Sequence, residues 1–134
     1  MNRVAHVIAE SDSGYAQKIR SGRHELTSDE AKSGGGTDTG PNPYSLLLSA
    51  LGACTSITLR MYAQRKGWEL GSIRVELDHY KDGDADRIER AIHFSAPLSE
   101  EEQRKLAETA EKTPVTKTLK RGTEIATTLH SGSV

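Results

Sequence analysis

One side chain in this sequence has clear nucleophilic potential, the thiol of Cys54, which is the only cysteine in the chain. The thiolate form of such a group attacks electrophiles and is oxidised stepwise, first to a sulfenic acid. Free cysteine is also among the most buried residue types, and Cys54 stands among Leu51, Ala53 and Ile57 in an apolar run. Burial without a neighbouring charge raises a thiol pKa, so spacing alone favours a plain core residue. Both interpretations stay open at this point.

A reactive Cys54 would need positive charge from another part of the chain. If the run around it is a helix, Cys54 lies about three turns past the helix start, too far for the helix dipole to act. The candidate cations are Arg20 and Arg23, with His24 adjacent, in a strand-like region ahead of the glycine-rich segment. Each is ordinarily a solvated surface charge, and the sequence does not distinguish Arg20 from Arg23.

Metal and phosphate chemistry find little support in the sequence. Gly34 to Gly36 could cradle a phosphate, but they neither complete a GxGxxG turn nor precede the Lys and Ser/Thr of a P-loop. A flexible connection is the preferred interpretation of this segment. The histidines show no HExxH spacing, and a single cysteine excludes CxxC, so neither a metal nor a cofactor is predicted. These histidines are His6, His24, His79, His93 and His130.

The element that must position Cys54 is a helix predicted from Pro43 to Lys66. Asn42 can cap it, Pro43 suits the first helical position, and Gly67 is a favourable stop. Its first half is apolar nearly all round, which is typical of a buried helix. In its second half we expect one buried side and one solvated side. The buried side is expected to hold Ala53, Ile57 and Met61, and the solvated side Arg60, Gln64, Arg65 and Lys66.

The remaining pattern predicts an α+β chain with segregated elements. Three short strands are expected before residue 30, and two alternating strands should form a hairpin around residues 81–84. Ser99 and Glu102 form a capping box that opens a helix with Leu106, Ala107 and Ala110 on its buried side. Thr113 and Pro114 begin a further helix that ends at Gly122, and residues 123–129 are predicted to form a last strand.

Composition limits the class of protein. The 134 residues suit one domain, 1–134, and only 34% of them are hydrophobic, with a mean hydropathy of -0.61. Because the central helix is so apolar, we expect a second chain to cover part of it. With 18 basic against 19 acidic residues and no basic face, no nucleic-acid partner is expected. No membrane span or secretion signal is predicted, and a single cysteine is typical of the reducing cytoplasm.

Three motifs together resemble the OsmC/Ohr family of thiol-dependent hydroperoxide reductases, and in particular its small YhfA-like branch. They are GPNPYSLLLSALGACTSITLRMYAQRKGW at residues 40–68, SGRHELTSDE at 21–30 and EKTPVTKTLKRGTEI at 111–125. The resemblance covers essentially the whole chain. It implies an OsmC-like α+β fold and an intertwined homodimer, in which antiparallel strands of both chains surround two central helices.

The resemblance also implies roles for individual residues. Cys54 stands at the position of the peroxidatic thiolate, and Arg20 or Arg23 at that of the catalytic arginine. The family's second cysteine, which resolves the sulfenic acid as a disulfide, is replaced by Thr113. The glutamate that orients the arginine falls at Tyr44 or Ser45, and neither can be an anion. One thiol therefore remains, so any peroxidase cycle would need an external thiol reductant, a cysteine of another protein, or Cys54 of the partner subunit.

Two functions of different class follow from these residues. The first is an enzyme that reduces organic hydroperoxides at Cys54, part of an oxidative-stress response. The second is a non-catalytic homodimer that binds a small hydrophobic or acyl ligand in an apolar pocket near Leu47, Leu51 and Cys54, next to Tyr44. The substrate and the reductant are not specified by the sequence.

Overall fold

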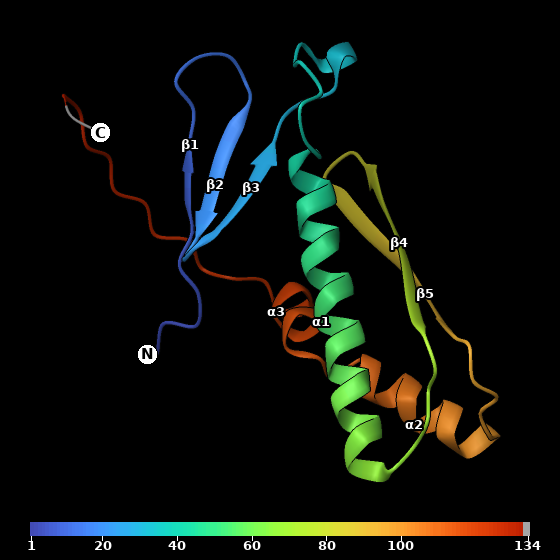
Figure 1. Cartoon of the computed structure of the whole chain (residues 1–134). Helices are drawn as coiled ribbons and strands as arrows, with labels where there is room; N and C mark the ends of the chain where they lie inside the picture. Colours follow the sequence, from blue (N-terminus) through green and yellow to red (C-terminus); the bar gives the residue numbers. More distant parts are fainter. Residues whose placement is uncertain (133–134) are drawn as a thin grey trace. The chain divides into compact units, whose positions relative to one another are not determined.

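A computed structural model describes residues 1–132 of the chain (Figure 1). The chain forms two compact units, and three elements have residues in both. The first unit consists of Met1–Ala50 and Leu77–Arg90, and the second of Leu51–Glu76 and the chain from Ala91 onward. The mixed content of strands and helices confirms the predicted α+β class.

The first unit contains a three-stranded antiparallel sheet. Its strands are β1 (Ile8–Glu10), β2 (Gln17–Ser21) and β3 (His24–Ser28), in the spatial order β1-β2-β3. The three predicted strands are confirmed, and β1 contains only three residues. Arg20 of the middle strand pairs with Ile8 of β1 on one side and with Glu25 of β3 on the other. These two pairings define the register of the three strands at this position.

The segment between β3 and the central helix is organised around a buried carboxylate. It contains a single 3-10 turn, η1 (Lys32–Gly34). The Asp29 carboxylate accepts hydrogen bonds from both the backbone and the hydroxyl group of Thr37 and of Thr39, at distances between 2.6 and 3.2 Å. At Gly36 a Cβ would lie 2.1 Å from the carbonyl oxygen of Glu30, so no larger residue fits there. The expectation of a flexible connection is wrong, because the Asp29 carboxylate holds the backbone N–H and hydroxyl groups of Thr37 and Thr39 by hydrogen bonds.

The central helix α1 (Pro43–Lys66) has the predicted bounds. At its start the Asn42 side chain accepts a hydrogen bond from the backbone N–H of Ser45 at 2.8 Å. At its end Gly67 has a φ of 72°, the left-handed conformation that closes helices and that glycine adopts without strain. Both terminal signals in the sequence are confirmed.

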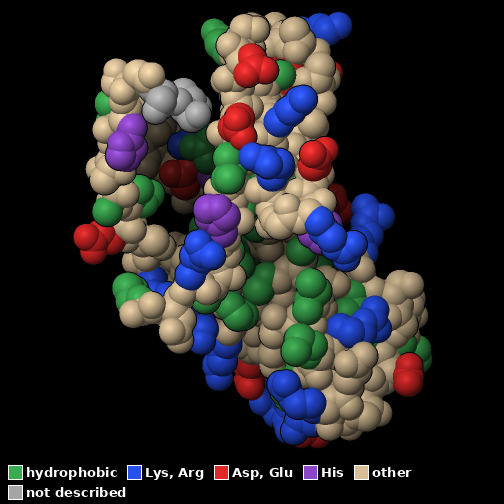
Figure 2. All heavy atoms as spheres, turned by 60° about the vertical axis from the view of Figure 1, so that its left-hand side comes forward, with side chains coloured by type: hydrophobic (Ala, Val, Ile, Leu, Met, Phe, Trp, Pro, Cys, Tyr) green, Lys and Arg blue, Asp and Glu red, His purple; other side chains and the backbone are tan. Residues whose placement is uncertain are grey.

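The buried side of α1 differs from the prediction. Within the chain the buried row is Leu51, Thr55, Leu59 and Ala63, which recur every fourth residue. Ile57 and Met61, predicted to be buried, are more than half exposed, at 59% and 53%. Both rows are apolar enough to pack, and hydropathy does not indicate which one contacts the chain's own core. Apolar side chains accordingly remain open to solvent in the space-filling view (Figure 2).

The core of the second unit joins α1 to two shorter helices. The hairpin of β4 (Ile73–Asp82) and β5 (Ala85–Phe94) leads to α2 (Glu100–Ala110) and α3 (Pro114–Arg121). The fully buried cluster consists of Leu59, Ala63, Leu70, Leu106 and Ala110. The predicted hairpin and both short helices are confirmed, including the capping box of Ser99 and Glu102 at the start of α2.

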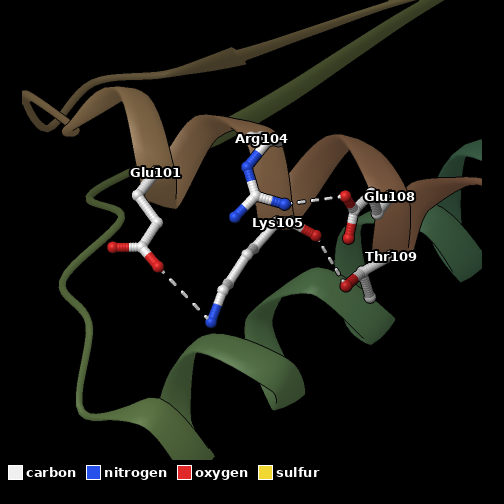
Figure 3. Close-up of polar contacts among 5 residues, drawn as sticks. All are labelled: Glu101, Arg104, Lys105, Glu108 and Thr109. Carbon is white, nitrogen blue, oxygen red and sulfur yellow. Dashed lines mark hydrogen bonds and ion pairs between the residues drawn. The ribbon is translucent and has the colours of Figure 1, made fainter.

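The solvent side of α2 carries two ion pairs with the four-residue spacing of neighbouring helical positions (Figure 3). Arg104 lies 2.9 Å from Glu108, and Lys105 lies 3.7 Å from Glu101. Each such pair stabilises a helix by only about 0.2–0.5 kcal/mol. Packing of Leu106 and Ala110 therefore holds α2 in place. Ala107, predicted to be buried beside them, is exposed.

The prediction of a last strand at the C-terminal end of the chain is wrong. Residues 123–129 form neither helix nor strand, and Ile125 and Leu129 are 84% and 86% exposed. Their alternation is that of a strand, but a strand also needs a partner edge, and this segment is hydrogen-bonded to none among the described residues.

Candidate functional site

Cys54 lies on α1 and is half-buried. The fully buried Thr55 and Leu51 flank it on one side, and the exposed Ala53 on the other. Its sulfur lies 3.9 Å from the hydroxyl oxygen of Thr58, one helical turn further on. This hydroxyl is the polar neighbour that the second unit provides for the thiol.

The two candidate arginines differ in whether they form an ion pair. Arg20 lies on β2 and forms an ion pair with Glu10 of β1 at 3.0 Å. Arg23 lies in the two-residue turn between β2 and β3, is exposed, and forms no ion pair within residues 1–132. Both belong to the first unit, whereas Cys54 belongs to the second. The first unit by itself therefore offers Arg23 as the more available guanidinium.

The position expected to hold a carboxylate is occupied by an aromatic ring that is already engaged. Tyr44 meets the His79 ring edge to face, with centroids 4.7 Å apart. The ammonium group of Lys81 lies 5.1 Å from the centre of the Tyr44 ring. A hydrogen bond with the Tyr44 hydroxyl, followed by one with Asp86, raises the pKa of Lys81. Ser45 uses its backbone N–H to complete the helix cap.

The sequence did not predict a charged cluster of His79, Lys81 and Asp86 that lies next to Tyr44. Asp86 accepts a hydrogen bond from His79 at 2.8 Å and pairs with Lys81 at 3.0 Å, and these contacts, the one with His79 first, hold the pKa of Asp86 below its ordinary value. The Nδ1 atom of His79 is buried without a hydrogen-bond partner in the described chain. A signal was present, because alternate residues of a predicted hairpin share one face.

Thr113, at the position of the family's second cysteine, is completely buried at the start of α3. Its side chain does not cap the helix, contrary to the expectation from its place before Pro114. Instead its hydroxyl shares a hydrogen bond of 2.6 Å with the hydroxyl of Thr116. The site therefore holds two hydrogen-bonded hydroxyl groups where a resolving thiol would stand.

The pocket expected near Leu47, Leu51 and Cys54 stays a prediction. A cavity of about 430 Å³ lies in the second unit, and none of those three residues lines it. Leu51 is buried and Leu47 is half-buried. Across residues 1–132, no three His, Cys, Asp or Glu side chains gather where they could hold a metal ion.

The sequence and fold of this chain were compared with those of known proteins. The sequence profile of the OsmC-like protein family matches residues 35–128, well over half of the chain. An α+β protein of this architecture, with one cysteine on its central helix, falls within the class that the profile describes. The chain belongs to the OsmC-like protein family. No curated protein sequence matches it.

Solved structures support the same fold. The crystal structure of an OsmC-like protein from Mycoplasma pneumoniae superposes with a TM-score of 0.70 at 21% identity, covering 90% of this chain and 89% of that one. The organic hydroperoxide resistance protein OsmC from Legionella pneumophila gives 0.64 at 20% identity, with 88% and 91% covered. The organic hydroperoxide resistance protein OhrB of Bacillus subtilis gives 0.61 at 25% identity, with 87% and 90% covered.

By length and composition alone, α1 could cross a membrane, with a window of mean hydropathy 1.3 that is 22% buried. The central helix of a soluble protein passes the same test. Because this helix is the central element of an OsmC-like fold, no membrane is indicated.

Proposed function

We propose that this protein reduces organic hydroperoxides at Cys54 and is regenerated by an external thiol. The Cys54 thiolate attacks one peroxide oxygen, the O–O bond breaks, and the leaving alkoxide takes a proton to become an alcohol. Cys54 becomes a sulfenic acid, which condenses with an external thiol to a mixed disulfide and water. A second external thiol releases Cys54 and leaves as part of a disulfide.

The observation that carries this proposal is the half-buried state of Cys54 on the central helix of an OsmC-like chain. Two of the structural relatives bear names that describe resistance to organic hydroperoxides. A half-buried cysteine can meet a small peroxide, and apolar neighbours on the helix such as Leu51 and Ala53 would favour an organic peroxide over hydrogen peroxide.

The need for an external thiol rests on Thr113. A hydroxyl cannot form a disulfide, and Thr113 is both buried and bonded to Thr116. After oxidation, Cys54 has no second cysteine in its own chain with which to react. A lone cysteine that must be re-reduced from outside suits a reducing compartment, and we place the activity in the cytoplasm.

For the cation, the available guanidinium of Arg23 is the better candidate in a dimer, since Arg20 is paired with Glu10. The homodimer itself is part of the proposal. It rests on Ile57 and Met61, two large apolar side chains of α1 that the chain leaves more than half exposed. An obligate interface resembles a core divided between two chains, and these residues would supply one half of it.

One experiment tests the proposal directly. The purified protein is treated with one equivalent of cumene hydroperoxide, and intact mass is followed with and without a thiol such as dithiothreitol. We expect one oxygen to add to Cys54, further oxygens to add in the absence of thiol, and slow turnover in its presence. Cys54→Ser should abolish all three. Unoxidised Cys54 after prolonged exposure would overturn the proposal.

A further inference from the structure

The cavity of the second unit is built by three elements and lies apart from Cys54. Leu59 of α1, Phe94 of β5 and Leu106 of α2 contribute apolar walls. Leu59 is five residues beyond Cys54 on α1, which is about 140° around the helix, so the two side chains leave it on different sides. Leu59 and Leu106 are buried core residues, which gives the cavity a fixed floor.

The polar side chains of the cavity are one imidazole and one amide. Its lining contains His93 and Gln103, and no Lys, Arg, Asp or Glu. The Gln103 side chain donates a hydrogen bond from Nε2 to the carbonyl oxygen of Leu98 at 3.0 Å. This bond fixes the amide and leaves its Oε1 available, because that oxygen has no other partner within residues 1–132. The cavity thus offers an apolar floor and an oriented hydrogen-bond acceptor.

We propose that this cavity binds a neutral, amphipathic small molecule, with its apolar body against Leu59, Phe94 and Leu106 and a hydroxyl or amide head at Gln103. The volume of about 430 Å³ lies within the roughly 300–1,000 Å³ of small-molecule sites. An ionised head would lose its hydration without gaining a charged partner, which disfavours carboxylates and sulfonates. The site goes beyond the proposed peroxide reduction, since Cys54 does not line it.

Ala107 gives a means of closing the site. It lines the cavity from α2 and is exposed, so a larger side chain there would project into the open space without disturbing the core cluster. The neighbouring Glu108 is also exposed on α2 and does not line the cavity. Ala107→Trp and Glu108→Trp therefore form a matched pair, one filling the cavity and one adding the same bulk outside it.

The test uses two fluorescent probes of similar shape and different charge. The full chain is titrated at pH 8, where imidazoles are generally neutral, with neutral N-phenyl-1-naphthylamine and with anionic 8-anilino-1-naphthalenesulfonate. We expect saturable binding of the neutral probe, at least tenfold weaker binding of the anionic one, and displacement by 1-octanol but not by octanoate. Ala107→Trp should weaken neutral-probe binding at least tenfold, whereas Glu108→Trp and Cys54→Ser should leave it unchanged.

Several outcomes would overturn this proposal. Equal binding of the two probes would show a non-specific apolar surface. Unchanged binding in Ala107→Trp, or loss of binding in Cys54→Ser, would place the probe elsewhere. A monomeric Ala107→Trp beside a dimeric Glu108→Trp would show that a second copy fills the cavity. If Ala107→Trp does not fold, Ala107→Leu replaces it with the same expectation. Failure of peroxide reduction leaves all of these readouts intact.

Discussion

The carboxylate of Asp29 accepts a hydrogen bond from the hydroxyl of Thr37 at 2.6 Å, across an eight-residue loop. The same oxygen accepts a second hydroxyl bond, from Thr39, at 2.8 Å. These two bonds, with the backbone N–H groups beside them, hold the pKa of the Asp29 carboxyl far below its ordinary value, the Thr37 bond being the largest cause. The loop that leads into α1 is thereby fixed by one buried charge.

The first prediction concerns Asp29→Asn. An amide offers only one acceptor oxygen and brings two donors against the N–H and hydroxyl groups of Thr37 and Thr39, so the substitution should destabilise the fold at neutral pH. Because the folded-state pKa of Asp29 lies below the unfolded value of about 3.9, its contribution is complete above that pH and is lost as pH falls toward the folded pKa. The difference in unfolding free energy between wild type and Asp29→Asn should therefore shrink below about pH 4.

Urea unfolding between pH 3 and pH 7 measures this difference. Asp38→Asn is the matched control, since Asp38 lies in the same loop, is exposed, and has a φ of 54° that asparagine also adopts readily. It should unfold like the wild type at every pH. A pH-independent loss in Asp29→Asn would show that the charge of Asp29 is not what orders the loop.

The second prediction concerns the end of α1. Gly67→Ala should destabilise by about 1 kcal/mol, because alanine is strained at a φ of 72° while no atom lies within 4 Å of the added Cβ. Gly67→Asn should lose less, since asparagine tolerates the left-handed conformation better. Thermal melts of the two variants check the order. Equal melting temperatures for Gly67→Ala and the wild type would mean that the conformation costs nothing here.

Much of this fold was predictable because its signals are local. The bounds of α1, the capping box at Ser99 and the helix at Pro114 all depend on residues within one turn of the boundary. Residues 123–129 have the alternation of a strand, but pairing depends on a distant edge that the sequence does not identify. The buried side of α1 was predicted wrongly for the same reason. Two rows of α1 are apolar enough to be buried, and only contacts with distant parts of the chain determine which row packs into the core.

The candidate site was predictable in its residue types and less so in its partners. Family resemblance located Cys54 and Thr113, yet it could not show that the Thr113 hydroxyl would bond to Thr116 instead of capping α3. Nor did it show that Tyr44 would meet His79 and Lys81 on the hairpin. The Tyr44 contacts join residues far apart in the chain, so the local sequence pattern carries no information about them. The Thr113 contact is local, but the sequence does not decide between a cap and a bond to Thr116.

The third prediction concerns oligomeric state. If the exposed row of α1 is an interface, Ile57→Glu or Met61→Glu should convert a dimer into a monomer at micromolar concentration, because each would bury an unpaired charge. Gln64→Glu on the exposed last turn of α1 should leave the dimer intact. Analytical ultracentrifugation distinguishes these states. A wild-type protein that sediments as a stable monomer would contradict the proposed dimer.

The last prediction joins Cys54 and Thr113 and tests whether the site retains the chemistry of its family. Thr113→Cys places a thiol at the start of α3, where the helix dipole lowers a thiol pKa. If its Cα atom can come within about 7 Å of that of Cys54, one equivalent of cumene hydroperoxide should yield a disulfide between the two. Turnover with dithiothreitol should then become faster than in the wild type, since resolution no longer waits for an external thiol.

The substitution has a structural cost that must be separated from its chemistry. Thr113→Cys removes the hydroxyl that bonds to Thr116 and leaves that buried hydroxyl with a weaker neighbour, a loss of about 1–3 kcal/mol. Thr113→Val removes the same bond without adding a thiol, so it should show the same loss of stability and no gain in turnover. Mass spectrometry of peptides after peroxide treatment decides the matter. If Thr113→Cys over-oxidises at Cys54 as the wild type does, the position of Thr113 is not within reach of Cys54, and the sulfur that resolves the sulfenic acid must come from outside the chain.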